Sequence, residues 1–185
     1  PRIKKKLNEL KIETKFIMGL RVTDEKVIKV VEEVMIEFNK EIVAALEKKG
    51  CQSRSITIKE NSSIYVEQKN KVLGYVGKPT KIDDKLIKKL IKEEFIPVIS
   101  PMGLDEKNQA YNINADTAAG ALAKSLKSRR LILMTDVEGV YDKDKKLISE
   151  IKVNEAEKLN YDETISEGMI PKIRTCIKAV NDGVR

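Results

Sequence analysis

The chain has 185 residues, with 36 Lys or Arg against 29 Asp or Glu and neither His nor Trp, which suits one domain or two small lobes with a sizeable core. The absence of His excludes Ser-His-Asp and Cys-His catalysis and His-ligated metal sites, so any catalysis must use carboxylates, Lys, Arg, backbone amides and a metal such as Mg²⁺. The net charge of +7 with only 4% aromatic residues favours small anionic ligands or a solvated Lys-rich surface over nucleic acid, and no apolar stretch is long enough for a membrane span.

The hydrophobic periodicity predicts helices that alternate with strands. In chain order we expect a helix over 1–10, a long helix over 23–49, strands over 53–58, 64–66 and 72–76, a helix over 83–94, a strand over 95–99, a helix over 115–127, a strand over 131–134, and helices over 155–159 and 171–181. This alternation indicates an α/β fold in which helices cover a parallel sheet. Ligands in such folds gather at the carboxyl ends of the strands and at the helix N-termini that face them.

Two of these elements carry a sharper expectation. Thr23 is a good N-cap for the long helix and Gly50 a good terminator, and the apolar stripe between them fits either a core-facing helix or a contact between subunits. The four residues at 131–134 are all apolar, which predicts a strand buried on both faces of the sheet.

The first candidate site is the segment that precedes the helix at 115–127, where Asn112, Asn114 and Asp116 crowd one helix N-terminus. Helix capping explains one of these polar side chains, and three are more than capping needs. We therefore expect a ligand role for at least one of them, since helix N-termini bind anions.

Three further candidates lie at predicted element ends. Asp136 follows the apolar strand, where it either borders a ligand or caps the next turn. Lys172 falls in the first turn of the last helix, a position that opposes the helix dipole unless an anion binds there. Arg21 precedes the long helix and either holds a carboxylate or forms a surface ion pair with Asp24 or Glu25.

The order of four motifs along the chain is more informative than each motif alone. They read Gly-Leu-Arg-Val-Thr-Asp at 19–24, Asn-Ile-Asn-Ala-Asp-Thr-Ala-Ala-Gly at 112–120, Thr-Asp-Val-Glu-Gly-Val at 135–140 and Gly-Met-Ile-Pro-Lys at 168–172. This set resembles the amino acid kinase family and, within it, the kinases that phosphorylate N-acetyl-L-glutamate. The stretches at 39–43, 95–101 and 147–149 support the resemblance, which covers nearly the whole chain.

The resemblance implies a three-layer αβα sandwich with a mostly parallel central sheet, in a single domain over 1–185. Residues 1–80 would form mainly the side that holds the amino acid and a dimer contact, and residues 81–185 mainly the nucleotide side. The implied reaction transfers the γ-phosphoryl group of ATP to the side-chain carboxylate of N-acetyl-L-glutamate, a step of arginine biosynthesis. ATP would bring the Mg²⁺ with it, so no protein metal site is expected.

The resemblance also implies roles for individual residues. Arg21 and Asn112 would hold the amino acid, Asp116 would orient the active-site lysines, and Lys172 would neutralise the charge of the phosphoryl group during its transfer. The nucleotide would lie beside Asp136, Val137, Glu138, Gly139, Val140 and Tyr141, together with Thr164, Ile165 and Ser166.

The chain departs from the family pattern in several places. It begins after the family's N-terminal Lys and glycine-rich loops and ends before the family's last elements, so we expect an internal fragment that is inactive alone. Ile58-Lys59-Glu60-Asn61 stands where the family often has Gly-Lys-Asp-Gly, which leaves the role of Lys59 open, and a family glycine is missing from 34–38.

Two alternative functions stay open at this stage. One is a related kinase of the same family that acts on another substrate, and the other is a non-catalytic paralogue that binds a ligand or regulates a partner. Cys51 and Cys176 stand alone in the sequence, which favours reduced thiols in a cytoplasmic protein. The long helix favours a homodimer or a larger homo-oligomer.

Overall fold

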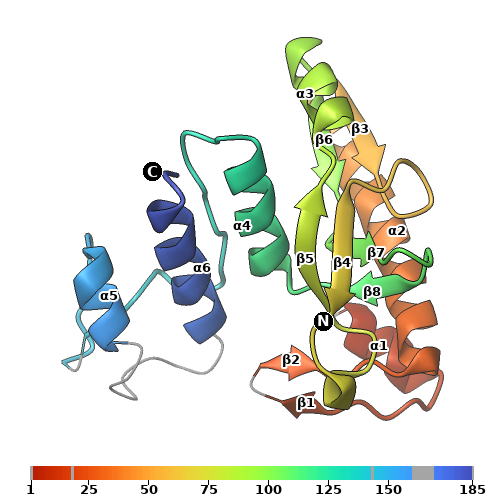
Figure 1. The fold of residues 1–185 in the computed structure, drawn as a ribbon, viewed down its shortest axis with the longest axis horizontal. Helices are drawn as coiled ribbons and strands as arrows, with labels where there is room; N and C mark the ends of the chain where they lie inside the picture. Colours follow the sequence, from red (N-terminus) through yellow and green to blue (C-terminus); the bar gives the residue numbers. More distant parts are fainter. Residues whose placement is uncertain (1, 18, 143, 160–168, 185) are drawn as a thin grey trace. The chain divides into compact units, whose positions relative to one another are not determined.

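The computed structural model describes residues 2–17, 19–142, 144–159 and 169–184, which form two compact units (Figure 1). The first unit covers Pro1–Ala118 and the second covers Ala119–Arg185, so that the boundary falls inside helix α4 (Ala115–Ser125). The first unit contains α1 (Arg2–Glu9), β1 (Phe16–Ile17), β2 (Leu20–Arg21), α2 (Glu25–Glu47), β3 (Ser53–Ile56), β4 (Ile64–Gln68), the 3₁₀ helix η1 (Lys71–Leu73), β5 (Gly77–Ile82), α3 (Lys85–Lys92), β6 (Ile96–Ile99), β7 (Met102–Leu104) and β8 (Ala110–Asn112). The second unit adds α5 (Val153–Leu159) and α6 (Ile170–Asn181).

Helix α2 begins and ends at defined capping residues. The carboxylate of Asp24 accepts hydrogen bonds from the backbone N–H groups of Lys26 and Val27, at 2.9 and 2.8 Å. The cap is therefore Asp24 and not the expected Thr23, whose side chain is fully buried. Gly50 ends the helix as expected, with a φ of 79° and its N–H donating to the carbonyl of Glu47.

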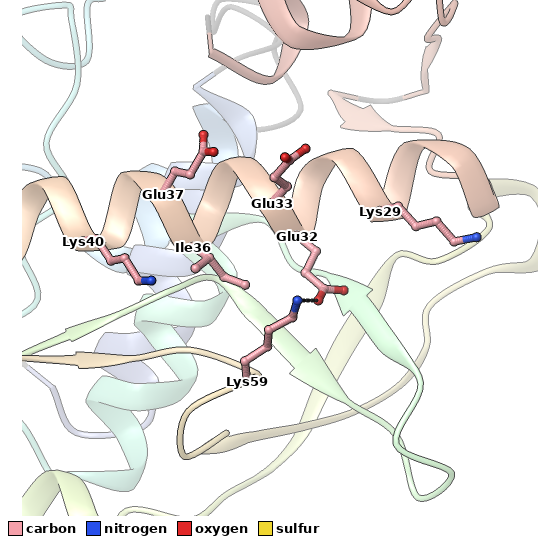
Figure 2. Close-up of a pocket in the computed structure, with 7 residues that line it drawn as sticks. All are labelled: Lys29, Glu32, Glu33, Ile36, Glu37, Lys40 and Lys59. Atoms are coloured by element: carbon pink, nitrogen blue, oxygen red, sulfur yellow. Dashed lines mark ion pairs between the residues drawn. The ribbon is translucent and has the colours of Figure 1, made fainter.

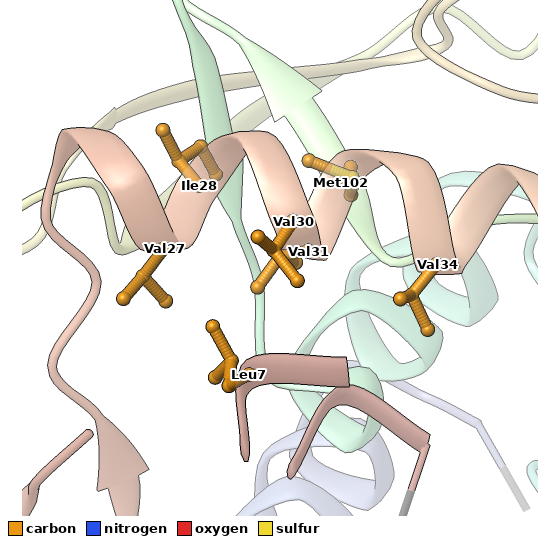
Figure 3. Close-up of a cluster of buried hydrophobic side chains, with 7 residues drawn as sticks. All are labelled: Leu7, Val27, Ile28, Val30, Val31, Val34 and Met102. Atoms are coloured by element: carbon orange, nitrogen blue, oxygen red, sulfur yellow. The ribbon is translucent and has the colours of Figure 1, made fainter. Parts of the chain in front are cut away.

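The apolar side of α2 packs against α1 and forms the main core of the first unit (Figure 3). The buried members of this core are Leu7, Val27, Ile28, Val30, Val31, Val34 and Met102. The core-facing interpretation of the stripe is confirmed for its first half, whereas Phe38, one turn further on, is 37% exposed under the guanidinium of Arg2.

The strands of the first unit form three sheets. β1 and β2 pair antiparallel, β3 and β6 pair parallel with Ser53 opposite Ile96, and a four-stranded mixed sheet has the order β5-β4-β7-β8. In that mixed sheet β4 pairs antiparallel with β5 and parallel with β7. Helix α2 packs on β3 and β6, so the fold is α/β with parallel strands covered by helices, as expected, although its sheets are shorter and more mixed than the sequence indicated.

Two expected strands are absent from the positions predicted for them. Residues 72–76 do not form a strand, because the side chain of Asn70 caps η1 and Gly74 takes a φ of 67°, and the strand starts at Gly77 instead. Residues 131–134 have no strand partner in the described part of the second unit, and Ile132 and Met134 are 77% and 90% exposed. The prediction of a buried strand there is wrong for this structure, because a strand needs a neighbour to satisfy its backbone.

The second unit is held together by α5 packed on α6 and by a small cluster of Ala123, Ala179 and Val184. A Cβ added at Gly120 would lie 2.8 Å from the Thr175 methyl carbon, so the absence of a side chain there lets α4 approach α6. Helix α6 has Pro171 in its first turn, as expected. Among the described residues, none of the helices combines the length and apolar character needed to cross a membrane.

Candidate active site

The β1–β2 hairpin holds Arg21, which pairs in register with Phe16. One guanidinium nitrogen of Arg21 (Nη1) donates a 3.0 Å hydrogen bond to the hydroxyl of Thr14, and its Cζ lies 4.6 Å from the centroid of the Phe16 ring. Desolvation by this partial burial lowers the pKa of Arg21.

The expected alternative for Arg21, an ion pair with an acidic neighbour at the start of α2, does not form. Asp24 caps the helix, and Glu25 pairs with Lys29 at 3.1 Å. Within the described part of the chain, Arg21 makes no ion pair with a carboxylate. The residue is therefore a partly desolvated cation that can still accept an anion.

A short run of backbone hydrogen bonds connects the Arg21 segment to the Asn112 segment. The N–H of Thr23 donates to the carbonyl of Leu73 at 2.9 Å, and the N–H of Tyr75 donates to the carbonyl of Thr23 at 2.7 Å. The carbonyl of Tyr75 then accepts from the N–H of Asn112 at 2.9 Å. The two residues expected to hold the amino acid thus lie on neighbouring segments, with only the Gly74–Tyr75 stretch between them.

The polar cluster ahead of α4 divides into a cap and two other side chains. The amide oxygen of Asn114 accepts from the N–H and the hydroxyl of Thr117, at 3.0 and 3.2 Å, so Asn114 is the helix cap. Asn112 ends β8 and is half-buried, and Asp116 lies in the first turn of α4 and is also half-buried. A ligand role for Asn112 or Asp116 stays a prediction.

The expected nucleotide segment, residues 136–141, is a loop of the second unit without regular secondary structure. Tyr141 bridges to Leu147, and its hydroxyl donates to a carboxylate oxygen of Glu138 at 3.0 Å. That hydrogen bond raises the pKa of Tyr141, because it favours the protonated phenol. Thr164, Ile165 and Ser166 lie outside the described residues.

Lys172 lies in the first turn of α6, as expected, and is half-buried. It belongs to the second unit with the 136–141 loop, whereas Arg21, Asn112 and Asp116 belong to the first. The structure brings together the Arg21 and Asn112 segments. The convergence of Asp116 and Lys172 on one site stays a prediction.

The hollow beside α2 shown in Figure 2 contains none of the expected site residues. It has a volume of about 440 Å³ and is lined mainly by charged side chains of α2, together with Lys59. The ammonium of Lys59 pairs with Glu32 at 3.3 Å, which gives Lys59 a structural contact. Asn61, where the family often has glycine, takes a φ of 63°, so the turn keeps a left-handed residue without glycine.

Two residues of this region were not found by sequence reasoning. Thr14 contacts the Arg21 guanidinium, and Gly74 lies at the junction between the Arg21 and Asn112 segments. A signal for Gly74 was present in the sequence, because a glycine inside the strand predicted over 72–76 indicates an irregularity or a close backbone approach.

Comparison with known proteins decides the family. The model of the amino acid kinase family matches residues 1–185. The chain belongs to the amino acid kinase family. It is 53% identical over 184 residues to the acetylglutamate kinase of Pelagibacter ubique, covering all of this chain and 64% of that protein. It is 44% identical over 198 residues to the acetylglutamate kinase of Brucella canis, covering all of this chain and 67% of that protein.

The fold of this amino acid kinase family member is also found among solved structures. The crystal structure of smu.665 from Streptococcus mutans superposes with a TM-score of 0.94 at 29% identity, covering 99% of this chain and 75% of that one. The chain thus spans about two thirds of the length of the curated relatives that it matches.

Proposed function

We propose that the whole protein transfers the γ-phosphoryl group of ATP to the side-chain carboxylate of N-acetyl-L-glutamate, a step of arginine biosynthesis. The similarity to two acetylglutamate kinases along all of this chain supports this substrate and reaction. The four motifs that carry the resemblance all lie within the matched residues.

The observation that carries the proposal is the environment of the Arg21 guanidinium. Its guanidinium is partly desolvated, and within the described residues its side chain has a hydroxyl and an aromatic ring as neighbours rather than an acid. A planar guanidinium suits bidentate binding of a carboxylate, and the backbone bridge through Tyr75 places the Asn112 segment close by. We assign these two side chains to the amino acid substrate.

The chemistry needs no general base. The substrate carboxylate is ionised at neutral pH and attacks the γ-phosphorus directly, so the absence of His is no obstacle. The barrier falls mainly through positioning and through cations that offset the charge of two anionic reactants. In this proposal Lys172 neutralises the transferred group, Asp116 orients the lysines, and the loop at 136–141, with Thr164, Ile165 and Ser166, borders the nucleotide.

Magnesium fits this scheme as an ion held by the nucleotide. Mg²⁺ often binds through substrate phosphates together with one or two carboxylates. When bound, the ion would neutralise phosphate charge. We also propose a homodimer or larger assembly, on the length of α2, and a cytoplasmic location, which the wide separation of Cys51 and Cys176 in the sequence favours.

The test is trapping of the acyl phosphate with hydroxylamine, using the whole protein with ATP and Mg²⁺. N-acetyl-L-glutamate should give the hydroxamate, and free L-glutamate and N-acetyl-L-aspartate should give far less. Lys172→Ala should abolish most of the product, whereas Lys178→Ala, an exposed residue in the last turn of the same helix, should not.

Two results would contradict the proposal. Product from a different carboxylate or phosphate acceptor would indicate a related kinase of the family. Binding of N-acetyl-L-glutamate without turnover by the folded protein would indicate a non-catalytic paralogue.

A further inference from the structure

Three backbone segments meet at Gly74, a residue that lies outside the four motifs. We propose that the contact between Thr23 and Gly74, called here the Thr23–Gly74 junction, sets the distance between Arg21 and Asn112. Both residues of the junction are then positioning residues for the amino acid substrate. This inference rests on the proposed function, because it concerns the same substrate site.

The junction has no room for a side chain at Gly74. A Cβ built there would overlap the carbonyl oxygen of Thr23 and would lie 3.0 Å from its carbonyl carbon. These are backbone atoms of the residue before the α2 cap, so they cannot move aside by a change of rotamer. Gly74 also takes a φ of 67°, where a residue with a side chain is strained. The close approach of the two segments therefore depends on glycine.

Each side of the junction is hydrogen-bonded to a segment that carries an expected substrate residue. Thr23 is fully buried, and its hydroxyl donates to the carbonyl of Arg21 at 3.0 Å. On the other side, Tyr75 connects Gly74 to Asn112 through the 2.9 Å bond from the Asn112 N–H. A displacement at Gly74 would therefore change the separation of Arg21 and Asn112.

Gly74 differs in this respect from another left-handed glycine of the first unit. Gly50 has a φ of 79°, but a Cβ placed there would meet nothing within 4 Å. Gly50→Ala therefore also places a side chain at a positive φ, but it does not push two segments apart. It is the matched control, remote from the substrate residues at the end of α2.

The experiment compares the steady-state kinetics of the wild-type whole protein, Gly74→Ala and Gly50→Ala. Misplacement of the substrate groups by a fraction of an ångström to 1 Å should raise the KM for N-acetyl-L-glutamate about 10- to 100-fold in Gly74→Ala. The KM for ATP should change by less than about twofold, since the change removes binding on one substrate side only. Gly50→Ala should leave both values unchanged.

A second variant, Thr23→Val, keeps the volume of the buried side chain but removes its hydrogen bond to Arg21. It should raise the KM for N-acetyl-L-glutamate by a smaller factor, about 3- to 10-fold, because one neutral hydrogen bond is lost. This variant decides the question if Gly74→Ala does not fold, which its circular dichroism and melting temperature will show.

The inference is overturned if folded variants of the junction keep the wild-type KM for N-acetyl-L-glutamate, or if the KM values of both substrates rise together. A wild-type protein that makes no acyl phosphate from N-acetyl-L-glutamate contradicts the proposed function instead. The two failures are thereby distinguished.

Discussion

Leu7 is the buried side chain that α1 contributes to the core of the first unit. It is fully buried against α2 in the core of Figure 3, where Val27 and Val31 are among its neighbours. Leu7→Ala removes three carbon atoms and leaves a cavity, which costs about 2–5 kcal/mol for a fully buried leucine. In a chain of this size each kcal/mol lost from the free energy of unfolding lowers the melting temperature by about 2–4 °C, so we expect the melting temperature of Leu7→Ala to fall by about 4–20 °C.

The matched control is Leu10→Ala. Leu10 lies just after the end of α1 and is 50% exposed, so its truncation should change the free energy of unfolding by less than about 0.5 kcal/mol. Denaturant unfolding followed by circular dichroism measures both variants. Equal destabilisation by the two changes, or a loss below about 1 kcal/mol for Leu7→Ala, would refute this account of the core.

Three further predictions follow from the cap of α2, the substrate arginine and two tyrosines. Asp24→Ala should cost about 0.5–2 kcal/mol in denaturant unfolding, and an equal effect of Glu25→Ala would contradict Asp24 as the cap. Arg21→Lys keeps the positive charge but loses the planar guanidinium that can donate two hydrogen bonds to one carboxylate, so the KM for N-acetyl-L-glutamate should rise about tenfold or more. An unchanged KM would argue against carboxylate binding by Arg21. Burial with the Asp105 carboxylate raises the pKa of Tyr111, and the hydrogen bond to Glu138 raises that of Tyr141. Both phenols should therefore ionise above pH 10 in an absorbance titration. Their contribution to the stability of the fold is present below about pH 10 and is lost as the pH rises through the folded pKa values. If either Tyr→Phe variant lost an ionisation step that lies below pH 10, the prediction would be contradicted.

The long helices could be predicted from sequence because their signals are local. The stripe and Gly50 predicted α2 to within a few residues at each end, and Pro171 marked the start of α6. The cap was misassigned because Thr23 and Asp24 are both good caps, and the choice depends on a tertiary contact. The N–H of Thr23 donates to Leu73, and its carbonyl accepts from Tyr75. An N-cap residue uses its carbonyl for the first hydrogen bond of the helix, so the cap falls to Asp24.

The strands were harder to predict because their partners lie far away in the sequence. The hairpin of β7 and β8 was missed, although Asp105 closes its turn by accepting hydrogen bonds from the N–H groups of Lys107 and Gln109. Four apolar residues at 131–134 look like a buried strand, yet burial requires neighbours that the local sequence does not specify.

In the candidate site, too, local sequence features could be predicted and contacts between distant segments could not. The motifs identified Arg21 and Asn112 by residue type and order, and the structure places their segments near each other. The spacing between them depends on Gly74, whose role appears only when the Thr23 carbonyl is seen beside it. Helix capping was predicted for one of the three polar side chains ahead of α4, and the hydrogen bonds to Thr117 show that this side chain is Asn114.

The most direct test of the central claim is a crystal structure of the whole protein with N-acetyl-L-glutamate and a non-hydrolysable ATP analogue. The account predicts that Arg21 and Asn112 contact the amino acid while Asp116 and Lys172 meet beside the γ-phosphate. A complex in which Asp116 and Lys172 face separate regions, or in which the amino acid lies away from Arg21, would contradict it.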